Sequence, residues 1–120
     1  MSDQTDAAHW PRQEIAAMAN EIAASEHDDH HRRWAAMVLE AVLTILELDS
    51  VEASPSIIAS HLLEPLAMKT TWDSVRAKGK LTPQTAPVPM LDVLTTLLTT
   101  PTEVRAIQFA RVVSHLKSLA

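Results

Sequence analysis

The chain of 120 residues contains no cysteine and only one glycine, Gly79. Without cysteine it cannot form a disulfide, a Cys-ligated zinc site, an iron–sulfur cluster or a thiol nucleophile. One glycine cannot by itself supply a Walker phosphate loop, a dinucleotide-binding fingerprint or a nucleophile elbow. Enzymes that depend on these motifs are therefore excluded.

The remaining residues offer no catalytic arrangement. Two serines directly precede a histidine, at residues 60–61 and 114–115. Consecutive side chains on a helix diverge by about 100° and cannot share a nucleophile–base hydrogen bond. Paired carboxylates occur only in a polar turn or on predicted helix surfaces. We therefore expect a protein that is not an enzyme and uses no cofactor.

The chain also lacks a long apolar run. No stretch approaches the roughly 18 residues of a membrane span, and the acidic residues 1–6 lack the basic region of a secretory signal. Apolar residues nevertheless make up 47% of the chain, far more than a disordered protein contains. We expect a cytoplasmic protein with no membrane partner, with a single helical domain over residues 1–120 and a flexible acidic N-terminus at 1–10.

Proline residues mark the predicted helix starts, since five of the seven prolines precede a stretch with apolar residues at helical spacing. This pattern predicts an all-α fold, a compact bundle of five to six short helices. The stretch 30–48 is apolar almost all round, which predicts a central helix covered on most sides. The predicted helices lie at about 11–25, 30–48, 55–63, 72–78, 89–99 and 101–118, with a proline-rich loop at 80–89.

Capping residues fix several of the predicted helix ends. Polar side chains with free oxygens satisfy the first N–H groups of a helix, and glycine suits the position after its last turn. The threonine-rich stretch 89–99 is a mediocre helix by propensity, so a strand is the alternative there. The predicted caps are Asp28 or Asp29 for 30–48, Thr70 or Thr71 for 72–78, Gly79 at the end of that helix, and a capping box of Thr100 and Glu103 for 101–118.

The formal net charge of −5 is unevenly distributed. Residues 1–68 hold twelve acidic and three basic side chains, whereas residues 69–120 hold three acidic and seven basic ones. Such polarity either docks two halves of one fold against each other or steers a charged partner. We favour docking within the fold, and the sequence leaves both interpretations open.

A polar block at residues 26–33 holds three of the six histidines. His27 and His31 are four residues apart, the spacing at which two imidazoles on one helical face share a metal ion. However, no glutamate base lies between them, as it does in a catalytic zinc helix, and no third ligand is fixed by spacing. We predict no metal site, with His27 and His31 as the candidate ligands if one forms. We interpret the block as a solvated, pH-responsive turn.

Lys69, Arg76, Lys78 and Lys80 form a basic stretch in an otherwise acidic chain. Their helix follows the predicted helix 55–63 in the order of a helix-turn-helix motif, which would let Arg76 and Lys78 contact DNA. The intervening turn is too long for that motif and lacks its customary glycine. A small helix-turn-helix-like DNA-binding regulator using residues 55–80 is therefore the alternative function.

The tryptophans are candidate anchors of an interface with another protein. Five or six short helices do not cover all the apolar surface of this chain, and uncovered apolar surface with a tryptophan anchor is typical of interfaces. Burial of every indole inside the fold is the other possibility. Trp72 begins the short basic helix and has fewer apolar neighbours in sequence than Trp34. We therefore expect Trp72 at the surface and Trp34 in the core.

These features together predict a non-enzymatic accessory, adaptor or inhibitor protein. It would bind a protein partner, or a second copy of itself, through an apolar surface rimmed by charges that set orientation. Nucleic acid is the less favoured partner. The predicted partner-binding residues are Trp72, Lys69, Arg76, Lys78 and Lys80.

Overall fold

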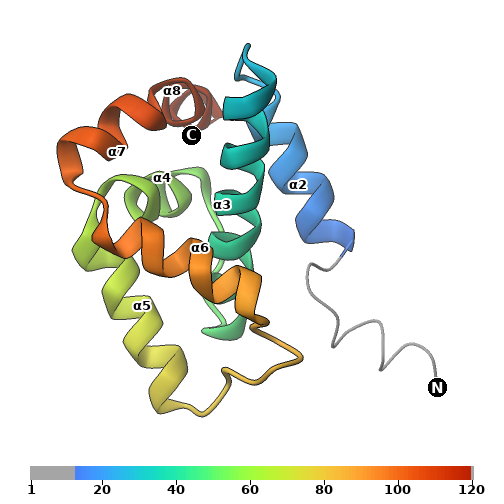
Figure 1. Cartoon of the computed structure of the whole chain (residues 1–120), viewed down its shortest axis with the longest axis vertical. Helices are drawn as coiled ribbons and strands as arrows, with labels where there is room; N and C mark the ends of the chain where they lie inside the picture. The colour runs from blue at the N-terminus through green and yellow to red at the C-terminus, as the bar shows by residue number, and fades with distance from the viewer. Residues whose placement is uncertain (1–12, 120) are drawn as a thin grey trace.

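The computed structural model describes residues 13–119, and this range forms seven α-helices and no strand (Figure 1). The predicted all-α fold is confirmed. The predicted flexible segment at residues 1–10 lies outside the described residues. The helices are α2 (Gln13–Ala23), α3 (Asp29–Leu48), α4 (Pro55–Leu63), α5 (Pro65–Ala77), α6 (Val88–Thr99), α7 (Thr102–Gln108) and α8 (Ala110–Leu119).

α2 and α3 form an antiparallel hairpin joined by the polar turn at residues 24–28 (Figure 1). The buried side chains of α2 recur at helical spacing and face α3. Asp28 caps α3 as predicted, because its carboxylate accepts a hydrogen bond of 2.7 Å from the backbone N–H of His30. The first two predicted helices therefore lie close to their predicted positions.

α3 buries half of its 20 residues and packs against α2, α4, α5 and α6. The buried hydroxyl of Thr44 is satisfied within the helix, since it donates a hydrogen bond of 2.7 Å to the carbonyl oxygen of Glu40. α6 crosses α3 in Figure 1. Within residues 13–119, none of the helices combines the length and the apolar character that a bilayer crossing requires.

A single residue, Glu64, joins α4 to α5. Ser54 caps α4 by accepting a hydrogen bond of 3.3 Å from the backbone N–H of Ile57. Glu64 is extended, with φ −111° and ψ 109°, because the residue before a proline avoids the helical region. The same Pro65 then starts α5 at once, since proline suits the first position of a helix. The prediction that this helix begins at 72 is therefore wrong.

The predicted threonine caps of this helix are also wrong. Thr70 and Thr71 lie inside α5, where the Thr70 hydroxyl donates to the carbonyl oxygen of Leu66 at 2.8 Å and the Thr71 hydroxyl oxygen lies 3.3 Å from the carbonyl oxygen of Ala67. The predicted end is right, because Gly79 follows the last turn with φ +69°. Glycine adopts this left-handed conformation without strain.

α6 is a helix, so the alternative of a strand is wrong. The hydroxyls of Thr96 and Thr99 donate to the carbonyl oxygens of Asp92 and Thr95 at 2.9 and 3.0 Å. These bonds satisfy the threonine side chains within the helix, while apolar burial supplies the stability that propensity lacks. The buried face of α6 consists of Met90, Val93, Leu94 and Leu97.

The predicted helix 101–118 is two helices, α7 and α8, which are separated at Phe109. Phe109 has φ −109° and ψ 16°, and its ring is buried in the core. The predicted capping box does not form. Instead, the hydroxyl of Thr100 donates back to the carbonyl oxygen of Thr96 at 2.6 Å, and Pro101 occupies the N-cap position.

Arg105 of α7 is fully buried, which no pattern in the sequence predicts. Its guanidinium donates to the carbonyl oxygens of Leu62, Leu97 and Thr100. These carbonyls lie at the C-terminal ends of α4 and α6, where helices lack internal donors. Burial lowers the pKa of Arg105, but a guanidinium stays protonated in proteins. Arg105 therefore ties α7 to the ends of two other helices.

The core can be tested with one buried and one exposed position on α3. Ile45 is 0% exposed and Met37 is 43% exposed. Ile45→Asp places a carboxylate in the apolar interior at a cost of several kcal/mol, about as large as the whole stability of a small domain. We expect this variant to lose its helical circular dichroism, whereas Met37→Asp keeps it. A folded Ile45→Asp protein with a cooperative melt would contradict this core.

Arg105→Met should destabilise the fold by about 2–4 kcal/mol, because it leaves three buried carbonyls without their donor. Chemical denaturation at neutral pH measures the loss. Arg111, which is exposed on α8, is the matched control, and Arg111→Met should change stability by less than about 0.5 kcal/mol. Equal denaturation midpoints for the two variants would show that the helix ends do not depend on Arg105.

Candidate functional site

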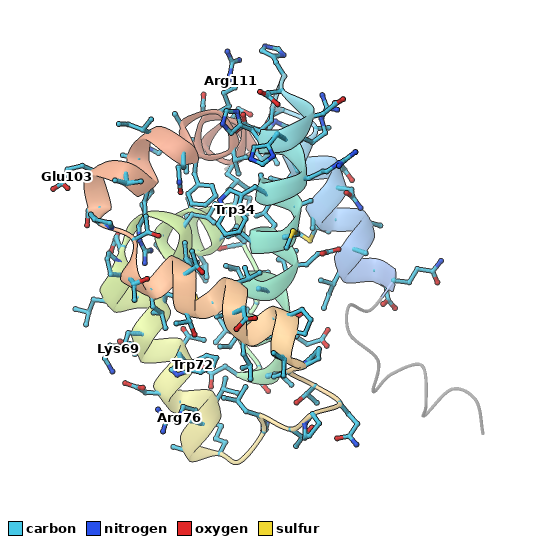
Figure 2. All side chains as sticks on the ribbon, viewed as in Figure 1. Trp34, Lys69, Trp72, Arg76, Glu103 and Arg111 are labelled. Carbon is cyan, nitrogen blue, oxygen red and sulfur yellow. The ribbon has the colours of Figure 1, made fainter. Side chains whose placement is uncertain are left out.

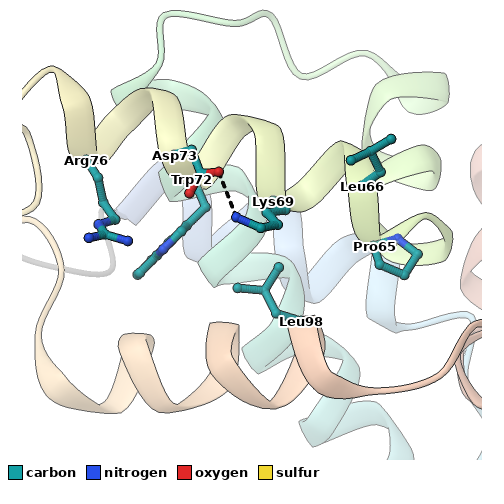
Figure 3. Close-up of a pocket in the computed structure, with 7 residues that line it drawn as sticks. All are labelled: Pro65, Leu66, Lys69, Trp72, Asp73, Arg76 and Leu98. Carbon is teal, nitrogen blue, oxygen red and sulfur yellow. Dashed lines mark hydrogen bonds and ion pairs between the residues drawn. The ribbon is translucent and has the colours of Figure 1, made fainter.

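A groove of about 520 Å³ between α5 and α6 is the candidate binding site (Figure 3). Its volume lies in the range of pockets that enclose a ligand. Three of the five predicted partner-binding residues line it, and Figure 2 shows these three along α5. The lining residues are Pro65, Leu66, Lys69, Trp72, Asp73 and Arg76 of α5 and Leu98 of α6.

The helical repeat of α5 explains why these residues meet. The lining positions recur every three or four residues from 65 to 76, so they share one face. The opposite face is buried through Met68, Thr71 and Val75. Burial of that face therefore fixes which side chains α5 presents to solvent.

The groove has an apolar end and a cationic end. In Figure 3 the side chains of Trp72 and Arg76 point toward α6, from which Leu98 faces α5. Pro65 and Leu66 lie at the other end, and the Leu66 side chain is 75% exposed. An exposed leucine beside an apolar groove adds apolar surface that a partner can bury.

The charges of the groove consist of one ion pair and one free cation. Lys69 Nζ lies 2.8 Å from Asp73 Oδ2, and both side chains are at least half exposed. The guanidinium of Arg76 has no hydrogen-bond or ion-pair partner among residues 13–119. Its five donors are therefore available to an acceptor from outside the chain.

The two tryptophans are less different than the sequence suggests. Both Trp34 and Trp72 are partly buried and pack against the core, so the expected contrast between a core and a surface indole is wrong. The indole N–H of Trp34 is buried without a hydrogen-bond acceptor among residues 13–119. Trp72 differs from Trp34 because it lines the groove.

Lys78 has a structural contact rather than a place in the groove. Its Nζ lies 2.8 Å from Asp49 Oδ1, an atom that also accepts a hydrogen bond of 2.6 Å from the Ser74 hydroxyl. These contacts join the last turn of α5 to the end of α3, and they are an example of docking between the acidic and basic halves of the chain. Lys80 is exposed beyond Gly79 and does not line the groove.

A second polar contact fixes the middle of α5 against α4. His61 is buried, and its Nε2 lies 2.7 Å from the hydroxyl oxygen of Thr71. The other ring nitrogen donates to the carbonyl oxygen of Ile57 at 2.9 Å, because a carbonyl can only accept. Two polar contacts therefore position α5: Asp49 binds its last turn, and His61 contacts its middle.

The histidine block forms a turn that Arg32 holds together. The Arg32 guanidinium donates to the carbonyl oxygen of Glu26 at 3.0 Å and pairs with Asp29 at 2.7 Å. His27 precedes α3, so it does not share a helical face with His31. Among residues 13–119, no three histidine or acidic side chains lie close enough to hold a metal ion. The backbone N–H of His30 lowers the pKa of the Asp28 carboxyl.

The α4–α5 pair departs from a helix-turn-helix motif in its connection. That motif joins its helices through a turn of three or four residues, whereas one residue separates α4 from α5. Lys69 and Lys78 are each paired with a carboxylate of this chain. The basic stretch therefore offers fewer free cations than its sequence suggests.

Sequence reasoning missed Pro65, Leu66, Asp73 and Leu98 as lining residues. The first two were placed outside a helix because the predicted start of α5 was too late. Leu98 belongs to the groove through packing between α5 and α6, which no local spacing encodes. With the helix start at 65, the repeat of outward positions from 65 to 76 would have revealed most of the face.

Comparison of the chain with protein-family models, with curated proteins and with solved structures finds no match in any of the three. The chemistry of the groove is therefore the basis for assigning a function.

The contact at Asp49 predicts a pH-dependent stability. Hydrogen bonds from Lys78 and Ser74 hold the pKa of the Asp49 carboxyl below its usual 3.8. A carboxyl with a lowered pKa stabilises the fold above its usual value, and this contribution disappears as the pH falls through the lowered one. Asp49→Ala should therefore cost about 1 kcal/mol at neutral pH and less as the pH falls toward 3.

Urea denaturation of the wild-type and Asp49→Ala proteins, from neutral pH to about pH 3, checks the prediction. Asp73→Ala, which breaks the exposed pair with Lys69, is the matched control and should change stability by less than Asp49→Ala. A constant difference between wild type and Asp49→Ala from neutral pH to about pH 3 would contradict the role of the carboxylate.

Proposed function

We propose that this chain is a non-enzymatic accessory, adaptor or inhibitor protein of the cytoplasm that binds a protein partner through the groove between α5 and α6. The observation that supports this most is the combination of Trp72 with exposed Leu66 and unpaired Arg76 along one groove. Tryptophan and arginine are enriched among residues that dominate the energy of protein interfaces. The apolar end supplies burial and the cationic end supplies orientation.

The chemistry of the lining residues favours binding over catalysis. The groove holds one ion pair, one arginine and apolar side chains. No histidine, serine, threonine or cysteine lies among these residues, and the two side chains that could act as a base or nucleophile, Lys69 and Asp73, are paired with each other and at least half exposed. A general acid–base or nucleophilic mechanism requires such groups within hydrogen-bond reach of the reacting atoms.

The alternative of a DNA-binding regulator using residues 55–80 has weaker support. Nucleic-acid affinity rises with the number of phosphates that free cations neutralise. Two of the four cations in this region are already paired within the chain, and the net charge is −5. A polyanion is therefore the less favoured partner.

The function is tested by retention of partners from extracts of the native source, with and without nuclease. The wild-type chain should retain a protein that survives nuclease, and both Trp72→Ala and Leu66→Asp should lose it, with affinity reduced by more than about 1 kcal/mol. Ile107→Ala is the matched control, because Ile107 is 79% exposed on α7 and lies outside the groove. Circular dichroism verifies that each variant is folded.

Two results would contradict the proposal. The first is a retained protein that is unaffected by both groove variants, since the groove would then not be the interface. The second is retention that nuclease abolishes and that falls when Arg76 and Lys78 become alanine, which would favour the DNA-binding regulator.

A further inference from the structure

We infer that the groove between α5 and α6 accepts an amphipathic helix of the partner, about three turns long, with an acidic residue beside Arg76. This inference rests on the proposed function and specifies the chemistry of the partner. Its support comes from the shape of the groove, the order of its side chains and the state of its charges.

The shape of the groove suits a helix. Its α5 wall runs from Pro65 to Arg76, a distance of about 16 Å at 1.5 Å per residue, which equals about three helical turns. α6 packs against α5 and contributes Leu98 to the other side of the groove. Binding by addition of a strand requires an exposed sheet edge, and residues 13–119 contain no strand. A third helix laid along two packed helices is a recognition mode that matches this length and these helical walls.

The order of side chains along the groove fixes the pattern of the partner helix. Pro65, Leu66 and Leu98 form the apolar end, Trp72 follows, and Arg76 is at the far end. A helix that covers these residues needs apolar side chains at positions i, i+3 or i+4, and i+7 to face the leucines and the indole.

The charges of the groove place an acidic residue at one end of this helix. Asp73 already accepts the hydrogen bond from Lys69, so a carboxylate in the middle of the groove would meet a like charge. The side chain of Arg76 has no hydrogen-bond or ion-pair partner among the described residues. An arginine binds a carboxylate through two parallel hydrogen bonds. Charge complementarity therefore selects an acidic residue next to Arg76.

Three synthetic peptides of about 14 residues, each stapled into a helix, test this inference. They share one apolar stripe and carry glutamate, glutamine or lysine at both ends, so that either orientation brings one of these residues to Arg76. Binding is followed through the indole N–H resonance of Trp72 in the ¹⁵N-labelled full chain, which Trp72→Phe identifies. We expect the glutamate peptide to shift this resonance and to bind about tenfold more tightly than the lysine peptide.

Charge reversal provides the matched comparison. Arg76→Glu should reverse the order of the glutamate and lysine peptides, whereas Arg111→Glu on α8 should leave the order unchanged. The difference between peptides should also shrink as salt is added, because the groove is exposed. Equal binding of the three peptides, or tighter binding of the lysine peptide by the wild-type chain, would contradict the inference that the partner helix carries an acidic residue beside Arg76. If no peptide shifts the Trp72 resonance, the inference that the groove binds an amphipathic helix is wrong.

These outcomes are distinct from failure of the proposed function. A protein that resists nuclease and is lost with Trp72→Ala, but is retained in full by Arg76→Glu, would leave the groove as the interface and overturn the acidic partner helix. Retention that does not depend on Trp72 would instead overturn the proposed function itself.

Discussion

Burial of the apolar surface of α3 is the constraint on which the other helices depend. This helix is apolar almost all round, so one neighbour cannot cover it, and α2, α4, α5 and α6 all pack against it. Hydrophobic burial has no preferred direction, and polar contacts therefore decide where each neighbour lies. α5 and α6 both face α3 with their apolar sides, and the seam between their outer sides is the groove.

Two groups of polar contacts set the geometry around that seam. On α5, Asp49 holds the last turn and His61 holds the middle. At the other end of the molecule, Arg105 donates to carbonyls at the ends of α4 and α6. Each group connects segments far apart in sequence, and each satisfies buried polar atoms that would otherwise destabilise the fold. The hydrophobic core thus supplies stability, while these contacts supply the relative positions of the helices.

The sequence predicts the parts of this structure that local rules determine. Helical spacing and the cap at Asp28 locate α3, helical spacing after a proline locates α4, and Gly79 marks the end of α5. The prediction fails where one residue both ends one helix and begins the next, and where the burial of a residue depends on a contact with a distant part of the chain. Pro65 both ends α4 and begins α5. Arg105 is buried because its guanidinium donates hydrogen bonds to carbonyl oxygens at the ends of α4 and α6. Three of the seven lining residues, Lys69, Trp72 and Arg76, were predicted because they fall within the basic stretch of one helix, whereas Leu98 lies on another helix and joins the groove through packing.

The groove takes all but one of its lining residues from α5, and this has a consequence for how the protein can change. Outward positions of α5 alternate with the buried positions Met68, Thr71 and Val75, and of the outward α5 residues Trp72 also packs against the core. Substitutions at the exposed outward positions alter recognition with little effect on folding. The exposed positions around Trp72 can therefore be changed for a new partner, by evolution or by design, while the remainder of the chain serves as an unchanged scaffold.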